Sequence, residues 1–132
     1  MTQFSSAHVS STLLAGKLVF IVEAQVPIAL LERSVALELG AAEVRCLSAN
    51  EALAMIHGGA KPDLAIVDIA DEATASSLIA RLDEAGVALV VTSADPWQGV
   101  AGAAVIRITK PYLETELVLA IAAAMGARTS SA

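Results

Sequence analysis

The sequence alternates between short apolar runs and longer stretches with helical periodicity. The apolar runs are rich in Val, Ile and Leu, and each ends at a polar or small residue, a pattern typical of strands buried on both faces. Because parallel neighbours need a crossover connection, this alternation predicts a parallel sheet with helices on both faces. The five predicted strands are Lys17–Val22, Glu43–Leu47, Asp63–Val67, Val87–Val91 and Ala104–Ile108.

Apolar residues at helical spacing occupy the stretches between these strands and after the last one. Glycines end the first three stretches, as is common at helix C-termini. The segment 95–102 is short and rich in Pro and Gly, so its helical pattern is the weakest. The five expected helices lie within Ile28–Leu39, Glu51–Ile56, Thr74–Glu84, Asp95–Gly102 and Leu113–Ala124.

The expected fold is therefore α/β, a flavodoxin-like, doubly wound sandwich whose five parallel strands take the order 2-1-3-4-5. At 132 residues the chain has room for one such domain, which we place at residues 17–126. The Ser-rich residues 1–16 and the residues 127–132 are expected to be flexible ends.

Composition narrows the class of partner and the compartment. The chain is 56% hydrophobic but only 3% aromatic, so its core must consist of small aliphatic side chains. A net charge of -6 argues against a nucleic-acid or anionic-membrane surface and favours a protein partner. Cys46, the single cysteine, excludes an intrachain disulfide and is expected to fill the core of a protein in a reducing cytoplasm.

Two further observations favour a soluble cytoplasmic protein. Residues 1–11 have neither a basic start nor a sustained apolar block, so we expect no signal peptide. The longest apolar stretch, Leu117–Met125, is far too short to span a bilayer.

Four polar residues lie at the ends of the apolar runs. Asp68 follows the third run and Glu23 the first, while Thr92 and Lys110 follow the fourth and fifth. Because the carboxyl ends of parallel strands converge on one crevice, we expect these side chains to be neighbours. Taken singly, Asp68 and Thr92 could be helix N-caps, and Lys110-Pro111 could begin a helix. Their coincidence at strand ends favours a phosphoacceptor site.

Four short motifs carry a resemblance to a known family. They are Leu18–Glu23, Pro62–Asp68, Val90–Ser93 and Thr109–Pro111. In this order they resemble the receiver domain of bacterial two-component response regulators, over about Lys17 to Met125. The resemblance implies a flavodoxin-like fold and phosphorelay signal transduction, with phosphoryl transfer to Asp68 from a histidine kinase or phosphotransfer protein.

The resemblance also assigns roles to the other residues, and their chemistry suits those roles. Lys110 would offset the negative charge of a phosphoryl group, and the Thr92 hydroxyl would donate to a phosphoryl oxygen. Mg²⁺ keeps several waters and therefore needs only one or two protein carboxylates. Glu23 and Asp68 would supply them, with the Ala70 backbone carbonyl as a third ligand.

The sequence departs from the family pattern at two functional positions. The family usually has two adjacent acids after the first strand, but Ala24 follows Glu23 here, so we expect a weakened Mg²⁺ site. Arg107 stands where the family normally has a Tyr or Phe that turns inward on activation. Thr92 and Arg107 therefore mark a switch position that must work differently.

Three functions remain open. The first is a single-domain response regulator, not an enzyme, in which a phosphoryl group on Asp68 alters partner binding through the segment 95–102, the strand 104–108 and the last helix. The second, motivated by Ala24 and Arg107, is a pseudo-receiver that binds proteins without phosphorylation. The third is a small flavodoxin-like enzyme with a bound cofactor. Residues 117–121 are apolar around much of the last helix, which predicts a surface for a homodimer or a protein partner.

Overall fold

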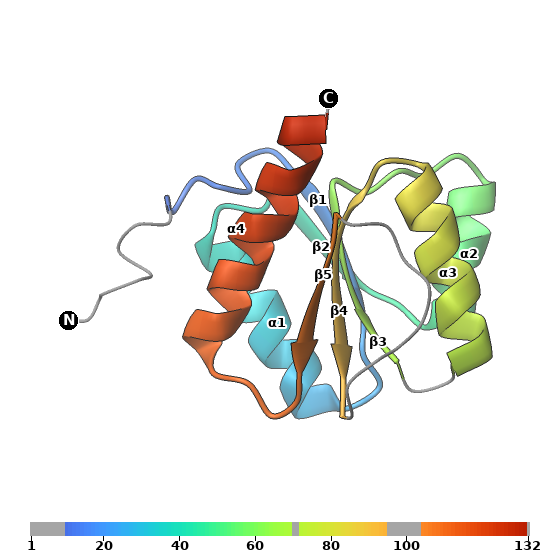
Figure 1. Cartoon of the computed structure of the whole chain (residues 1–132), viewed down its shortest axis with the longest axis horizontal. Coiled ribbons are helices and arrows are strands. Elements are labelled where there is room, and N and C mark those ends of the chain that lie inside the picture. Colours follow the sequence, from blue (N-terminus) through green and yellow to red (C-terminus); the bar gives the residue numbers. More distant parts are fainter. Residues whose placement is uncertain (1–9, 70–71, 95–103, 132) are drawn as a thin grey trace.

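The computed structural model describes residues 10–69, 72–94 and 104–131 (Figure 1). The strands are β1 (Leu18–Val22), β2 (Glu43–Cys46), β3 (Leu64–Asp68), β4 (Ala88–Ser93) and β5 (Val105–Thr109). They form one parallel sheet in the order β2-β1-β3-β4-β5, which confirms the predicted topology. The three inner strands are almost wholly buried because helices cover both their faces, whereas β2 and β5 lie at the edges.

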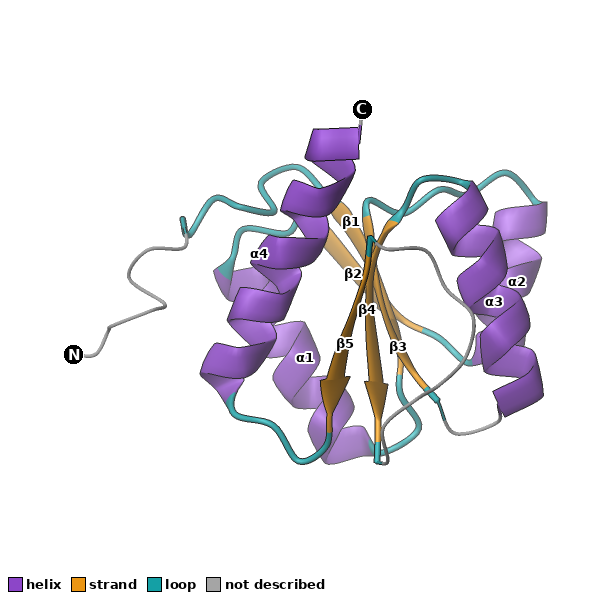
Figure 2. Ribbon diagram, viewed as in Figure 1, coloured by secondary structure: helices purple, strands orange, loops and turns teal. Residues whose placement is uncertain are grey.

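Helices lie on both faces of this sheet (Figures 1 and 2). They are α1 (Val26–Glu38), α2 (Ala49–His57), α3 (Glu72–Glu84) and α4 (Glu114–Ser131). The helices α1 and α4 pack on one face and α2 and α3 on the other, and each pair covers its own apolar cluster of the core. The helix expected at Asp95–Gly102 lies outside the described residues, so α4 is the helix that the sequence placed last.

Local sequence signals fix the helix starts and turns. The Ser48 hydroxyl accepts from the Glu51 backbone N–H, and the Glu51 carboxylate accepts from the Ser48 N–H, which forms a capping box at the start of α2. Pro27 lies in the first turn of α1, where a helix needs no backbone donor. Gly40 turns the chain after α1 with φ of 100°, and a side chain there would meet the Ser11 carbonyl oxygen at 3.1 Å.

Both ends of the domain are packed further than the sequence indicated. Leu14 is fully buried among apolar side chains of the α1 and α4 face, so the flexible end predicted for residues 1–16 is wrong for its last residues. At the other end, α4 continues into the tail predicted at 127–132 and reaches Ser131. The Arg128 guanidinium anchors this last turn by donating to Asp83 Oδ1 at 2.6 Å.

The expectation that Cys46 fills the core is also wrong. Cys46 is exposed rather than part of the core, because it ends the edge strand β2. On α4, Val118 is buried together with Leu117, so less apolar surface remains than the sequence predicted, with Leu119 45% exposed. Within the described ranges, no helix has the length and apolar character needed to cross a membrane.

Candidate functional site

The carboxyl ends of the parallel strands meet along one edge of the sheet, at the lower end of the molecule in Figure 2. Asp68 is the last residue of β3 and pairs in register with Thr92 of β4. Glu23 directly follows β1, and Lys110 directly follows β5. The Lys110 N–H donates to the Ser93 carbonyl oxygen at 2.7 Å, which holds the start of the loop after β5 against β4.

The four side chains predicted to converge do so. The Thr92 hydroxyl donates to Asp68 Oδ1 at 3.0 Å, and Lys110 Nζ lies 2.8 Å from the same oxygen. Lys110 Nζ also lies 2.7 Å from Glu23 Oε1. One ammonium therefore joins two carboxylates that belong to different strands, and one hydroxyl orients the carboxylate at the end of β3.

The charged side chains of this cluster are largely buried. The side chains of Glu23, Asp68 and Lys110 are 1%, 10% and 12% exposed. Burial alone would lower the pKa of Lys110, but its hydrogen bonds and charge interactions with Asp68 and Glu23 outweigh burial, and the pKa is raised. Lys110 therefore stays protonated, and the carboxylates leave an excess of negative charge.

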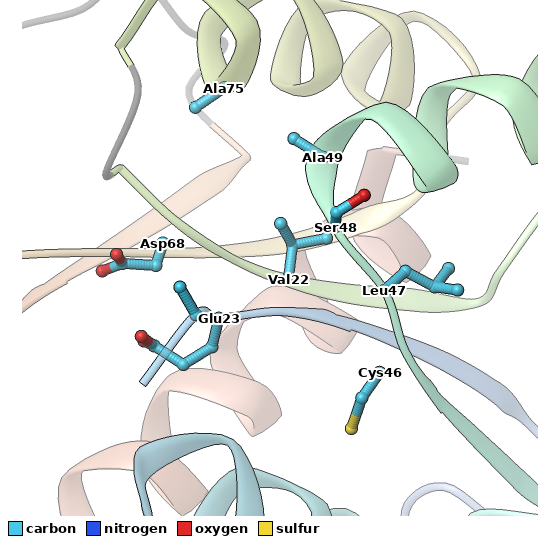
Figure 3. Close-up of a pocket in the computed structure, with 9 residues that line it drawn as sticks. Val22, Glu23, Cys46, Leu47, Ser48, Ala49, Asp68 and Ala75 are labelled. Carbon is cyan, nitrogen blue, oxygen red and sulfur yellow. The ribbon is translucent and has the colours of Figure 1, made fainter. Parts of the chain in front are cut away.

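A pocket of about 380 Å³ opens beside the two carboxylates (Figure 3). Glu23 and Asp68 supply its acidic wall, and small side chains of Ala24, Ala49 and Ala75 line much of the rest. Figure 3 shows both carboxylates at one end of the pocket and pointing the same way. The volume of a phosphoryl group is only a few times that of one water molecule. The pocket is therefore large enough to hold a phosphoryl group beside Asp68.

Two of the three predicted Mg²⁺ ligands, Glu23 and Asp68, lie within the described residues. Ala70, whose carbonyl was expected to be the third ligand, lies outside the described residues. Glu23 and Asp68 each direct one oxygen to Lys110, and Ala24 contributes no carboxylate. In the part of the chain that the structure describes, no group of three or more His, Cys, Asp or Glu side chains is placed to hold a metal ion. These residues offer a metal at most two carboxylates.

The two predicted switch residues lie on neighbouring strands in different environments. Thr92 is fully buried on β4 and contacts the Asp68 carboxylate through its hydroxyl. Arg107 on β5 is in register with Val91, and its side chain is exposed. Arg107 is therefore a charged surface residue at the position where the family resemblance implies an aromatic residue.

The structure adds two residues that the sequence analysis did not single out. Glu32 of α1 is fully buried, and the Tyr112 hydroxyl donates to its Oε2 at 2.6 Å. Glu32 lies three residues after Ala29 and three before Val35, both of which are buried. This spacing was the available signal, because residues three apart share a helix face and a carboxyl on a buried face needs a partner.

Several solved structures that are similar to this chain are response regulators. A response regulator receiver protein from Sinorhizobium medicae aligns with 88% of this chain and 98% of its own, at a TM-score of 0.72 and 20% identity. A response regulator from Thermotoga maritima aligns with 84% of this chain and 98% of its own, at a TM-score of 0.69 and 22% identity. The solution structure of the REC domain of the PhyR response regulator from Erythrobacter litoralis aligns over 85% and 92%, at a TM-score of 0.66 and 20% identity. No family model and no curated protein matches the sequence.

This is the receiver fold. The resemblance drawn from four short motifs is thereby confirmed for the architecture, including the sheet order and the nearly complete coverage of single receiver domains. At identities of 20% to 22%, the likeness carries the fold alone. What the receiver fold does in this chain has to be argued from its own strand-end residues.

Proposed function

We propose that this chain is a cytoplasmic receiver in two-component signalling, a phosphoryl acceptor rather than an enzyme, whose Asp68 is phosphorylated by a histidine kinase or phosphotransfer protein. The proposal is carried by the surroundings of Asp68. Its Oδ1 lies 2.8 Å from Lys110 Nζ and 3.0 Å from Thr92 Oγ1, and its side chain borders an open pocket. Phosphorylation would then change the affinity for a protein partner.

The transfer follows from these contacts. An Asp68 carboxylate oxygen attacks the phosphorus of a phosphohistidine, the bond from phosphorus to the imidazole nitrogen breaks, and an acyl phosphate forms while the freed imidazole takes up a proton. Lys110, kept charged by its raised pKa, offsets the negative charge that gathers on the phosphoryl oxygens. Before transfer, the Thr92 hydroxyl donates to Asp68 Oδ1. After transfer, the same hydroxyl is close enough to donate to a phosphoryl oxygen instead.

We propose that Mg²⁺ binds this site weakly, through Glu23 and Asp68. Both carboxylates are hard oxygen ligands of the kind Mg²⁺ prefers, and the ion keeps most of its waters, so two protein ligands are enough. Each carboxylate already contacts Lys110, and Ala24 supplies no further charge. When bound, the ion would neutralise negative charge next to Asp68.

The alternative is a pseudo-receiver. Because Lys110 contacts both Glu23 and Asp68, the cluster can serve as a structural crosslink between the ends of β1, β3 and β5. In that case the surface formed by α4 and β5 would bind a partner whatever the state of Asp68. The two functions differ in one measurable property, the uptake of a phosphoryl group.

The deciding experiment is incubation of the protein with acetyl phosphate over a range of Mg²⁺ concentrations, followed by intact-mass measurement. We expect the wild type to gain the mass of one phosphoryl group and Asp68→Ala to gain none. Asp63→Asn is the matched control, because Asp63 precedes the same strand at its opposite end, where it accepts from the Leu18 N–H at 2.8 Å. Absence of uptake in the wild type at every Mg²⁺ concentration would leave the pseudo-receiver.

We propose that α4 carries the partner surface. Leu113, which precedes the helix, is 68% exposed, and Leu119 of the helix is 45% exposed. A homodimer or a target protein would cover them. Sedimentation at high concentration should show a dimer in the wild type and a monomer for Leu119→Glu, whereas an unchanged monomer in both would exclude the homodimer.

A further inference from the structure

The loop that follows β5 is tied to α1 by a buried hydrogen bond. Residues 110–113 leave the sheet edge with Lys110 at their start, and the Tyr112 hydroxyl donates to Glu32 Oε2 at 2.6 Å. At the far end of the loop, the Leu113 N–H donates to Glu116 Oε1 at 2.6 Å. The residue that carries the site ammonium therefore lies two positions from a side chain fixed to α1.

Packing alone does not hold this loop against α1. A second pocket, of about 400 Å³, lies between them and is lined by Lys110, Pro111 and Tyr112 together with Ile28 and Leu31 of α1. A loop that borders a pocket can shift without overlapping packed atoms. The Tyr112 ring packs against the core cluster of this face, and the hydrogen bond to Glu32 fixes its hydroxyl end to α1.

Glu32 is an unusual anchor for such a bond. Its residue is fully buried, and among the described residues its Oε1 has no hydrogen-bond partner. An aliphatic side chain at this position would bury the same volume without leaving an oxygen unpaired. A carboxyl retained there at a cost in stability needs a reason beyond packing.

The charges around Glu32 supply one. The groups that act on it are Tyr112, Glu23, Lys110 and Asp68, three of which form the site. Burial is the largest cause and raises the pKa of Glu32 to about 7, and the negative charges of Glu23 and Asp68 act in the same direction. The Tyr112 hydrogen bond and the positive charge of Lys110 oppose this rise.

We propose that Glu32 and Tyr112 are positioning residues of the Asp68 site, which hold the loop that carries Lys110 and transmit the charge state of Glu32 to it. A charged Glu32 adds a third negative charge near Lys110. This charge repels the negative phosphoryl group and slows its transfer to Asp68. A protonated Glu32 removes that charge while the short contact to Tyr112 is kept. The effect on phosphoryl uptake rests on the proposed function, but the coupling between Glu32 and Lys110 does not.

The coupling can be measured without any phosphoryl donor. Carbon-13 NMR of labelled lysine side chains, followed from ~pH 5 to ~pH 9, should show the Lys110 signal shifting with a midpoint near the pKa of Glu32. Lys17 and Lys61 serve as internal references because they precede β1 and β3, at the opposite end of the sheet. The shift should disappear in Glu32→Gln, and in Tyr112→Phe its midpoint should rise, because the Tyr112 hydrogen bond lowers the pKa of Glu32.

Phosphoryl uptake then tests the consequence. With acetyl phosphate, the ratio of the uptake rate of Glu32→Gln to that of the wild type should grow on the order of tenfold as the pH rises through this midpoint. The ratio cancels the ionisation of the donor itself. If neither protein takes up a phosphoryl group, the proposed function fails while the Lys110 titration still stands.

Three results would overturn the positioning role. The first is a wild-type Lys110 signal that does not change near the midpoint, which needs no variant and does not depend on whether Glu32→Gln folds. The second is a Lys110 titration that is identical in the wild type and in Glu32→Gln. The third is a Tyr112→Phe midpoint that stays in place or falls.

Discussion

The two faces of the sheet surround Asp68 in opposite ways. Toward α1 and α4, the strand-end cluster is flanked by a buried acid, Glu32, and its hydrogen-bond donor, Tyr112, which lies two residues after Lys110. Toward α2 and α3, the neighbours of Asp68 are the small side chains of Ala49 and Ala75 around a pocket of about 380 Å³. The α1 and α4 side holds the fixed charges, and the space that borders Asp68 lies on the α2 and α3 side, because the second pocket, of about 400 Å³, is not lined by Asp68.

This asymmetry indicates where each requirement of the proposed phosphoryl transfer would be met. Charge compensation has to be preorganised, and it comes from groups that the α1 and α4 side keeps in place by burial and short contacts. Access has to be open, and the alanines on the other side provide it. We therefore expect changes on the first side to alter stability and pH dependence, and changes on the second side to alter metal affinity and access.

The largest expected effect is on stability when Glu32 is replaced by Leu. The pKa of Glu32 is raised from 4.5 to about 7 on folding, so the folded state holds a proton that the unfolded state has lost. The free energy of unfolding should therefore fall as the pH rises from 4.5 through about 7, by about 3 kcal/mol for a shift of this size. Glu32→Leu should lack this loss, and urea unfolding at a series of pH values measures it.

The slope with pH is the decisive quantity, because Glu32→Leu also leaves the Tyr112 hydroxyl without its acceptor and changes stability at every pH. Glu38→Gln is the matched control, since Glu38 is an exposed acid near the end of the same helix. It should keep the wild-type slope. Equal slopes in the wild type and Glu32→Leu would show that folding does not raise the pKa of Glu32.

The difference between the two sides also explains what the sequence could and could not reveal. Asp68, Thr92 and Lys110 were predictable because apolar runs mark strands locally, and parallel strands bring their ends to one edge. Glu32 was missed because an acid within the predicted helix Ile28–Leu39 has the character of an ordinary surface residue. Its burial between Ala29 and Val35 depends on how α1 packs against α4 and the sheet.

Edge effects account for the other errors. Cys46 has the apolar character of a core residue, but its exposure depends on the strand order, which leaves β2 with a neighbour on only one side. Leu14 stands in a Ser-rich stretch, and its burial depends on how that stretch folds back over the end of α1, where its N–H donates to the Leu39 carbonyl. Such contacts between distant segments have no periodic signal in the sequence.

The next largest effect should be on Mg²⁺ affinity when an acid is introduced beside the pocket. Ala24 is exposed and lines the pocket beside Glu23, so Ala24→Asp would add a third carboxylate to the two of the proposed Mg²⁺ site. We expect Mg²⁺ affinity to rise about tenfold, measured by titration calorimetry, because ligand charge dominates the binding of a hard cation. Ala42→Asp, at an exposed alanine before β2 and hence at the other end of the sheet, should leave the affinity unchanged. Equal affinity in Ala24→Asp and the wild type would argue against Mg²⁺ ligation by Glu23 and Asp68.

The smallest effect tests the space itself. Ala49 begins α2 and lines the pocket, so Ala49→Val would reduce the room beside Asp68 without altering any charge. Uptake from acetyl phosphate should slow by about threefold, less than the roughly tenfold effect of one methylene in a closed pocket, because this pocket is open. The pH-dependent shift of the Lys110 signal near neutral pH should stay as in the wild type. Ala54→Val makes the same change on the exposed side of α2, where it should affect neither measurement. If Ala49→Val instead shifted the Lys110 titration, the two sides of the site would be coupled, and the division between fixed charge and open space would fail.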